Sequence, residues 1–244
     1  MNLIAYTALR YGKDYYDAAI RSVIDAVDQY HVLYAVEPSH GHWSDAPCPD
    51  SEDELRAIAE ARAGSKLRWH RGHWRYEGEQ RDSIHQFAPD TDVILVLDAD
   101  EVWPEALIEN ALLAARYEQS RTYRAPMVHF FRSMHRAILH DPAFPTRLIL
   151  PNVRSGEDVL HGPPICHFGY AQRPEIVAYK WKIHGHLNEL RRDVDWFRDV
   201  FLANRQTDCH PVGSEYWNPE PVNPLDYLPA WMSEHPYYGL KVIE

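Results

Sequence analysis

The feature that most constrains this chain is the segment VILVLDADEVW at residues 93–103, where a run of five apolar residues ends in three acids. Unbroken apolarity, without the alternation of a half-exposed strand, indicates a strand covered on both faces, as at the centre of a parallel sheet. In open α/β sheets, ligands bind beyond the carboxyl ends of the strands. Acids at such an end are costly unless they have a partner. The segment therefore predicts a central strand with a binding site at its end.

The preceding residues alternate between strand-like and helix-like patterns. A Ser-x-x-Glu capping box at Ser51 marks the start of one helix. Before the central strand, strands are expected at 2–9, 31–37 and 65–70, and helices at 14–30, 51–63 and 77–88. This order predicts an α/β fold with a mixed, mainly parallel central sheet and flanking helices.

The pattern changes after the central strand. A helix is expected to start at Pro104, followed by strands at 122–133 and 146–152 and helices at 174–183 and 188–203. The last 40 residues hold six prolines and six tryptophans or tyrosines, which is too aromatic for a disordered tail. We expect one domain over 1–204 and a C-terminal extension, 205–244, packed on it.

Composition restricts the possible partners. With 244 residues, 45% of them hydrophobic, the chain can bury the core of a single domain. A formal net charge of −11 gives no general attraction to nucleic acid or to an anionic membrane. The three cysteines, Cys48, Cys166 and Cys209, are widely and irregularly spaced, as expected for reduced thiols. Without a signal-like start or 18 consecutive apolar residues, a cytoplasmic protein with no transmembrane segment is expected.

The acids after the central strand form a candidate metal site. If the strand stays extended, Asp98 and Asp100 project to the same side while Ala99 faces the core. Two carboxylates together suit Mg²⁺ or Mn²⁺ and leave room for substrate phosphates. Alternatively, Asp100 or Glu101 caps the next helix, but that leaves Asp98 unexplained.

These elements, the Gln-Arg pair in the helix before the central strand and the Asp-x-Asp segment resemble a family 2-type glycosyltransferase of the GT-A (Rossmann-like) fold, over about residues 1–185. The resemblance implies metal-dependent, inverting transfer of a sugar from a nucleotide-sugar, expected to be a UDP-sugar, to an acceptor hydroxyl. It makes Asp100 a direct ligand of Mn²⁺ or Mg²⁺. Asp98 would contact the ribose, or the metal through water, while Glu101 occupies a family position of less defined role.

The resemblance extends to three later or neighbouring positions. RSGEDVL at 154–160 resembles the family's Gly-Glu-Asp segment, making Asp158 the expected catalytic base and Glu157 its alternative. ICHFGY at 165–170 resembles the segment whose histidine completes the metal site, which is His167 here. Arg81 matches a residue near the nucleotide. If the base is neither Asp158 nor Glu157, the next candidates are Glu175, His161 and Asp141.

The first strand offers weaker candidates for contacts with the base of the nucleotide. Tyr6, Thr7 and Arg10 could stack on it or hydrogen-bond to it, although surface roles explain each equally well. Among the 15 histidines, His184 and His186 form a compact HGH group without the spacing of a zinc site, and we hold them in reserve.

Residues 66–81 are basic and aromatic, as suits a nucleotide, a sugar ring or a nucleic acid. A saccharide or lipid-linked glycan is the preferred acceptor, and a DNA-modifying variant ranks below it.

Three rival functions remain. The strand and its acids also fit the first motif of haloacid dehalogenase-type phosphatases, with Asp98 as nucleophile and Asp100 as general acid, although that motif normally closes the first strand of the chain. A sugar nucleotidyltransferase is disfavoured because residues 2–12 lack a Gly-rich phosphate loop. A non-enzymatic sugar-binding protein would need no metal. Metal-dependent binding of a nucleoside diphosphate separates the transferase from all three.

Overall fold

The fold is built on a seven-stranded sheet with the order β10-β6-β9-β4-β1-β2-β3. The computed structural model describes residues 1–38, 43–117, 119–213 and 217–239. The strands of this sheet are β1 Leu3–Leu9, β2 Gln29–Ala35, β3 Leu67–Gly72, β4 Val93–Val96, β6 Thr122–Arg124, β9 Thr146–Ile149 and β10 Glu157–Val159. β9 runs antiparallel to β4 and β6, and all other neighbours are parallel. The mixed, mainly parallel central sheet is as expected.

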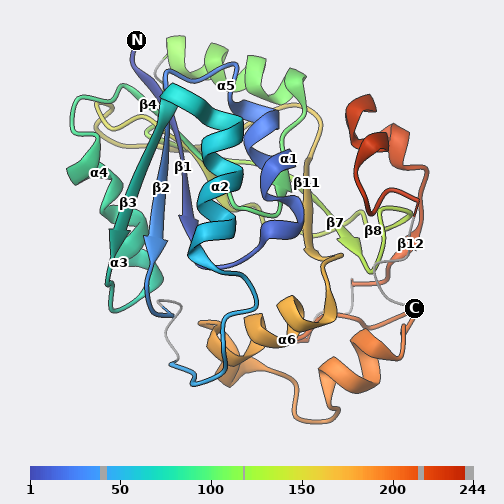
Figure 1. The fold of residues 1–244 in the computed structure, drawn as a ribbon. Helices are drawn as coiled ribbons and strands as arrows, with labels where there is room; N and C mark the ends of the chain where they lie inside the picture. The colour runs from blue at the N-terminus through green and yellow to red at the C-terminus, as the bar shows by residue number, and fades with distance from the viewer. Residues whose placement is uncertain (39–42, 118, 214–216, 240–244) are drawn as a thin grey trace.

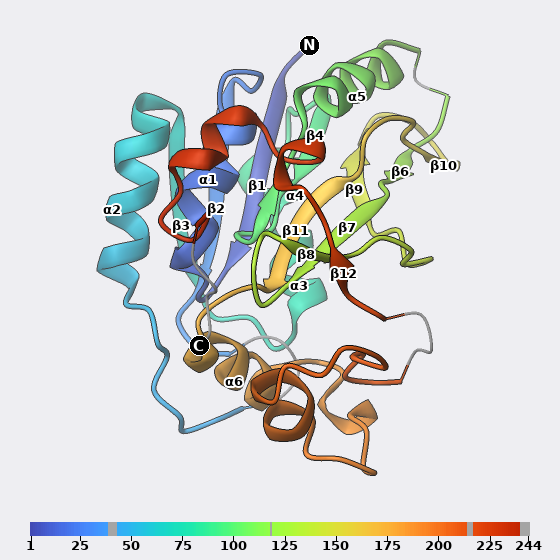
Figure 2. The same ribbon diagram turned by 90° about the vertical axis from the view of Figure 1, so that its right-hand side faces the viewer.

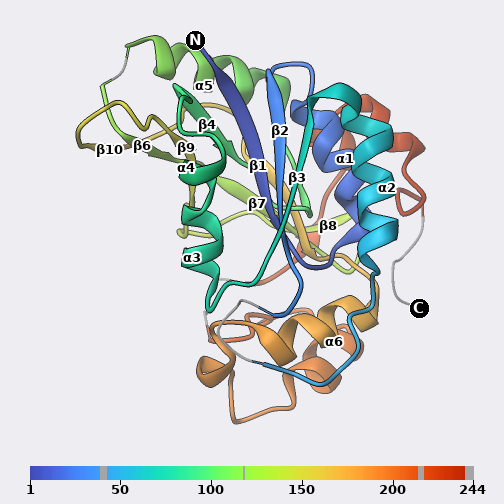
Figure 3. The same ribbon diagram turned by 60° about the vertical axis from the view of Figure 1, so that its left-hand side comes forward.

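Helices cover both faces of this sheet (Figure 3). One face carries α1 Lys13–Val23, α2 Glu52–Ala63 and α5 Glu105–Tyr117, and the other carries α3 Glu77–Asp82 and α4 Ile84–Phe87. Alternation along β1 explains the two faces, because Leu3 and Ala5 join the cluster that contains residues of α1, α2 and α5, whereas Ile4 and Tyr6 pack with Ile84. The capping box of α2 is present, with Ser51 and Glu54 bonding each other's backbone N–H.

A second sheet has the order β12-β8-β7-β11-β5. Its strands are β5 Glu101–Val102, β7 Met127–Phe131, β8 Arg136–Ile138, β11 Ile165–Tyr170 and β12 Glu220–Pro221. The single strand expected at 122–133 is therefore wrong. It divides at Ala125 and Pro126, so that β6 stays in the first sheet and β7 enters the second (Figure 2). Proline has no backbone N–H to donate to a ladder and suits such a break.

The C-terminal third forms short elements around this framework (Figure 1). Helix α6 spans Pro174–Ile183 as predicted, but the helix expected at 188–203 is reduced to a 3-10 turn at Leu187–Glu189 and a π-helical segment at Trp196–Leu202. Further 3-10 turns span Gly64–Lys66, Pro224–Asp226 and Ala230–Glu234.

The described part of 205–244 packs against the rest of the chain. Leu228 and Met232 share a buried cluster with Tyr15 of α1, and Trp217 packs with Phe201. The division at residue 204 stays a prediction. In the part of the chain that the structure covers, the three cysteines are free thiols, and no helix is long and apolar enough to cross a membrane.

Candidate active site

The acids after β4 lie in a turn rather than in an extended strand. β4 ends at Val96, and Glu101 N donates to the carbonyl oxygen of Asp98 at 3.1 Å. Ala99 packs inward, as predicted. The segment is a turn and not the extended strand on which the same-side expectation rested, yet both carboxylates line one cavity. The two carboxylates meet different partners.

Asp98 lies between two arginines. Arg81 of α3 donates from Nη2 to Oδ1 at 2.9 Å, and Arg147 of β9 donates from Nη2 to Oδ2 at 2.8 Å. Burial raises the pKa of Asp98, but the two guanidinium groups outweigh it and hold the pKa well below its usual range. Asp98 thus holds two arginines, which disfavours a direct metal ligand or a nucleophile at this position, and its expected contact with the ribose, or with a metal through water, stays a prediction.

Arg147 also pairs with Glu101. Its Nε donates to Glu101 Oε2 at 3.0 Å, and its Nη2 contacts the same carboxylate. The Glu101 side chain is fully buried, so it anchors Arg147 and does not cap α5. The phosphatase alternative loses its support here, because β4 is not the first strand and the nucleophile it requires, Asp98, is tied to two cations.

Asp100 faces His167 because of strand pairing. β5 runs antiparallel to β11 with His167 opposite Glu101, and Phe168 N donates to the carbonyl oxygen of Asp100 at 2.8 Å. His167 Nε2 lies 3.7 Å from Asp100 Oδ2, and Gln172 Nε2 donates to the same oxygen at 3.0 Å. The resemblance named Asp100 and His167 as ligands, and the structure brings these two together.

Burial has opposite effects on the two groups. It raises the pKa of Asp100, against the nearby Lys180 ammonium, and it lowers the pKa of His167 well below its usual value. A neutral imidazole is the form of histidine that binds metals. Across the described residues no group of three or more His, Cys, Asp or Glu side chains could enclose a metal ion. Asp100 and His167 are thus two groups of the kinds that can bind a divalent cation, without a third such group placed to share the ion with them in the described residues.

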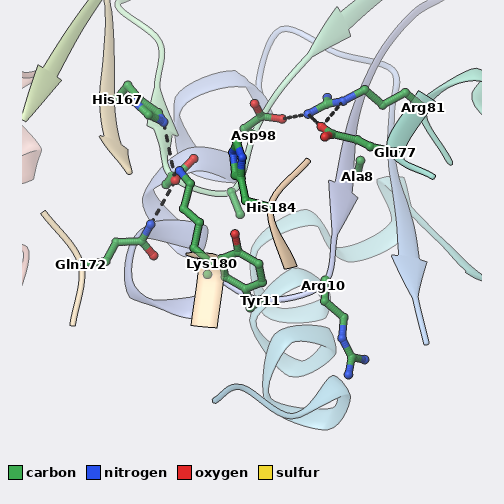
Figure 4. A pocket seen from close by; sticks show the side chains of 13 residues that line it. Ala8, Arg10, Tyr11, Glu77, Arg81, Asp98, His167, Gln172, Lys180 and His184 are labelled. Atoms are coloured by element: carbon green, nitrogen blue, oxygen red, sulfur yellow. Dashed lines mark hydrogen bonds and ion pairs between the residues drawn. The ribbon is translucent and has the colours of Figure 1, made fainter. Parts of the chain in front are cut away.

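A cavity of about 130 Å³ surrounds this pair (Figure 4). Its lining is Ala8, Arg10, Tyr11, Gly12, Glu77, Arg81, Asp98, Ala99, Asp100, His167, Gln172, Lys180 and His184. We call it the donor cavity, after the ligand proposed for it below. In Figure 4 the Arg81–Asp98 pair lies on one side of Lys180, a residue of α6, and His167 and Gln172 lie on the other. Three kinds of chemistry thus meet in one place: a carboxylate–imidazole pair, a fixed guanidinium and an ammonium.

A larger cavity of about 680 Å³ adjoins the donor cavity, and we call it the acceptor cavity. The two share Asp98, His167, Lys180 and His184. The remaining lining of the acceptor cavity is Arg124, Met127, His129, Pro142, Ala143, Phe144, Pro145, Arg147, Tyr170, Trp181, His186, Glu189, His210, Pro211, Val212 and Trp217. The arrangement suits two ligands that meet at the shared residues.

Three residues were expected to contact the base of the nucleotide, and the structure places them differently. Tyr6 is 2% exposed and lies in the core beneath α4. Thr7 lies on the opposite face of the sheet, where its Oγ1 is 2.7 Å from Tyr30 OH. Arg10 lines the cavity, but its guanidinium points away from Asp98 (Figure 4) and donates to the carbonyl oxygens of Ala35 and Val36. Alternation along β1 buries Tyr6 and Thr7, which corrects their assignment to the nucleotide.

The expected base does not reach either cavity. Asp158 and Glu157 are exposed on β10, the edge strand, separated from β4 by β6 and β9. Asp158 accepts a hydrogen bond from Val159 N at 2.8 Å, and Glu157 pairs with Arg124 at 3.1 Å. The Gly-Glu-Asp pattern here forms a turn and an edge strand.

The alternative candidates for the base differ in where they lie relative to the two cavities. Glu175 and His161 are exposed and line neither cavity. Asp141 contacts a residue of the acceptor cavity, since its Oδ2 lies 3.1 Å from His129 Nε2. The two histidines held in reserve do line the acceptor cavity, and His186 Nδ1 lies 2.9 Å from Glu189 Oε1.

The basic stretch at 66–81 is less available to an anion than its composition suggests. Arg71 pairs with Glu52 at 3.0 Å and Arg75 pairs with Glu79 at 3.2 Å. Paired guanidinium groups attract a polyanion less, so the DNA variant loses its electrostatic support.

Sequence reasoning missed several residues of the site, namely His129, Arg147, Gln172 and Lys180. Arg147 had a visible signal, because it directly precedes the apolar run LIL at 148–150 within an expected strand, where a charged side chain needs a buried partner. Gln172 and Lys180 carried no comparable signal. They reach the site because β11 and α6 place them there.

Asp50 fixes the loop that contains Gly12, a residue that lines the donor cavity. This buried carboxylate accepts from Gly12 N at 2.7 Å and Lys13 N at 3.0 Å, and Arg173 Nη2 donates to its other oxygen at 2.8 Å. Gly12 has φ 116°, and a Cβ there would lie 3.3 Å from the Ala99 side chain. We call this group the Asp50 clasp, and it joins the loop after β1 to the loop after β11.

No family model and no curated protein matches this chain. One matching solved structure is the crystal structure of residues 1–349 of S. aureus TarS. It superposes with a TM-score of 0.40 and 12% identity, over 53% of this chain and 36% of that chain. The chain thus spans little more than a third of the TarS structure. A likeness this weak establishes no family.

Proposed function

We propose that this protein is a metal-dependent glycosyltransferase of the GT-A type, transferring a sugar from a nucleotide-sugar, expected to be a UDP-sugar, to an acceptor hydroxyl. The observation that carries the proposal is the meeting of Asp100 and His167 at the carboxyl end of β4, in a cavity that also holds Arg81 and Lys180. A pair of metal-binding groups beside two cations suits a diphosphate, which is the leaving group of such a donor.

Asp100 and His167 are the residues that would hold Mn²⁺ or Mg²⁺. When bound, the metal would act as a Lewis acid and neutralise charge on the departing diphosphate. Gln172 orients Asp100 through its hydrogen bond to Oδ2.

Arg81 and Lys180 would supply the remaining positive charge. Glu77 and Asp98 hold the Arg81 guanidinium in place, so it needs no reorganisation when the diphosphate leaves. Lys180 lines both cavities, which places its ammonium where donor and acceptor would meet.

The acceptor cavity favours a saccharide or a lipid-linked glycan. Trp181, Tyr170 and Trp217 contribute aromatic surface, and the histidines contribute hydrogen-bonding groups. An inverting displacement also requires a base, and we assign this role to His186. Its Nδ1 faces Glu189, which would leave Nε2 free to accept the acceptor's proton.

Calorimetric titration with UDP in the presence and absence of Mn²⁺ tests the proposal, with Asp100→Asn as the paired variant. We expect Mn²⁺-dependent binding in the wild type and its loss in the variant. A screen of nucleotide-sugars by thermal shift then identifies the donor, because a ligand at 100 times its dissociation constant adds about 2.7 kcal/mol of stability. Nucleotide binding that is equally tight without metal would contradict metal dependence, and binding without turnover would favour a sugar-binding protein.

A further inference from the structure

Four side chains form a row across the junction of the two cavities: Asp141, His129, His167 and Asp100. His129 Nε2 lies 3.1 Å from Asp141 Oδ2, His129 Nδ1 lies 2.7 Å from His167 Nδ1, and His167 Nε2 lies 3.7 Å from Asp100 Oδ2. The two histidines are register partners on β7 and β11, so the sheet itself sets their rings side by side. The His129 ring is nearly buried, at 7% exposed.

Asp141 is fixed at the far end of this row. Ala143 N donates to Oδ1 at 2.8 Å, and Trp217 Nε1 donates to Oδ2 at 2.9 Å. Trp217 is 4% exposed, so the indole and the carboxylate hold each other beneath the surface. The contact from Asp141 to His129 is less well aligned than a hydrogen bond, but an ionised carboxylate can only accept. Without a hydrogen on His129 Nε2, its lone pair would face a carboxylate oxygen at 3.1 Å, so this geometry favours a hydrogen on Nε2.

The hydrogen on His129 Nε2 determines the rest of the row. In a neutral imidazole one nitrogen donates and the other accepts, so His129 Nδ1 is an acceptor. His167 Nδ1, at 2.7 Å, must then donate, which leaves an unprotonated lone pair on His167 Nε2.

We propose that Asp141 and His129 are positioning residues that hold His167 as its Nδ1–H tautomer, with the Nε2 lone pair directed toward Asp100. The ligand expected at that lone pair, a divalent cation, rests on the proposed function. The tautomer of His167 does not depend on that function. Outer carboxylate and imidazole groups of this kind orient metal-binding histidines in general.

The other side of the His167 ring is equally constrained. A Cβ on Gly169 would lie 2.5 Å from His167 Cε1 and 2.7 Å from Nε2, and 3.1 Å from Lys180 Nζ. Only a glycine leaves space for the ring at this position. His129 and Gly169 thus confine His167 from two sides, so its orientation is built into the sheet.

Long-range ¹H–¹⁵N NMR of the intact, metal-free chain tests the tautomer directly, with the His167 signals assigned through His167→Gln. We expect the Nδ1–H form in the wild type and its loss in His129→Phe, which keeps a ring but removes both nitrogens. An Nε2–H form in the wild type would overturn the proposal, whatever the protein's activity.

Mn²⁺ affinity, measured by electron paramagnetic resonance in the absence of nucleotide, gives the second readout. We expect His129→Phe to lose about tenfold or more in affinity. His129→Gln should lose much less, since its amide can donate to Asp141 and accept from His167. A role in packing alone predicts the reverse order, because Phe fits beside Trp217 better than Gln does, and that result would overturn the proposal.

The two failures are distinguishable. If the wild type shows the Nδ1–H tautomer but binds no Mn²⁺, the metal-dependent function is wrong and the positioning role stands. If Mn²⁺ binds through Asp100 and His167 while both His129 variants bind it as the wild type does, the positioning role is wrong and the function stands.

Discussion

Asp98 and Asp100 are two residues apart in the sequence, yet they have different partners: Asp98 pairs with Arg81 and Arg147, whereas Asp100 faces His167. The turn at 98–101 separates them. The first of the two acids organises cations and the second is the one available to a metal, so equal substitutions at the two positions should have unequal effects.

Asp98→Asn should destabilise the fold more than Asp100→Asn does. Removing one partner of a buried pair costs about 3–5 kcal/mol, but Glu77 and Glu101 still pair with the two arginines, so we expect about 2 kcal/mol for Asp98→Asn. Asp100→Asn should change stability by less than about 1 kcal/mol and abolish Mn²⁺-dependent binding of UDP. Urea unfolding and calorimetry measure the two effects. Equal destabilisation by both variants would contradict the division of roles.

Gly169→Ala should impair the metal site without unfolding the chain. The added methyl would displace His167 and the Lys180 ammonium, and we expect Mn²⁺ affinity to fall about tenfold or more. Gly213→Ala is unsuited as a control, because Gly213 has φ 109°. Gly239→Ala is the better one, since a Cβ there meets nothing within 4 Å. Unchanged Mn²⁺ affinity in Gly169→Ala would show that His167 does not bind the metal.

His186→Gln should slow sugar transfer by about 10²-fold or more while leaving Mn²⁺-dependent UDP affinity nearly unchanged, as expected for a base that acts on the acceptor. Asp158→Asn, on the exposed edge strand, should transfer at the wild-type rate. Steady-state kinetics with the donor identified by the screen compares them. If Asp158→Asn is the slow variant, the base lies where the sequence resemblance placed it, and β10 must approach the site during turnover.

The pKa of Asp141 makes a prediction about acid stability. Burial raises the pKa, but contacts from His129, Ala143 and Trp217 outweigh it and lower the pKa to about 2. The unfolded value is about 3.9. A depressed pKa stabilises the folded state above the unfolded value, and this stabilisation is lost as pH falls toward the folded value. The urea midpoint of the wild type should therefore fall more steeply between these two pH values than that of Asp141→Asn. Parallel curves would mean that Asp141 is not ionised in these contacts.

The sequence predicts the elements of the fold better than the geometry of the site. Periodicity and a capping box suffice for β1 and α2, because each depends on local residues. The helix expected over 14–30 is correct only as far as Val23, since Gln29 and Tyr30 belong to β2. The turn at 98–101 could not be predicted this way, since it depends on β5 pairing with β11, and that pairing joins residues 101 and 167. Asp158 shows the converse error, in which a short motif matched a family segment but lies on an edge strand. Arg147, Gln172 and Lys180 enter the site through tertiary contacts that no local pattern reports.

The Asp50 clasp has a consequence for the order in which contacts form during folding. It joins Gly12 to Arg173, residues that only the finished sheet brings together, and the contact between Asp100 and His167 likewise joins distant parts of the chain. Contacts at such sequence separation form late in folding, because loop closure opposes them until enough of the chain is in place. A nucleotide would thus recognise the completed protein and not its folding transition state. Saturating UDP and Mn²⁺ should lengthen the lifetime of the native state, and the refolding rate should stay as it is without them.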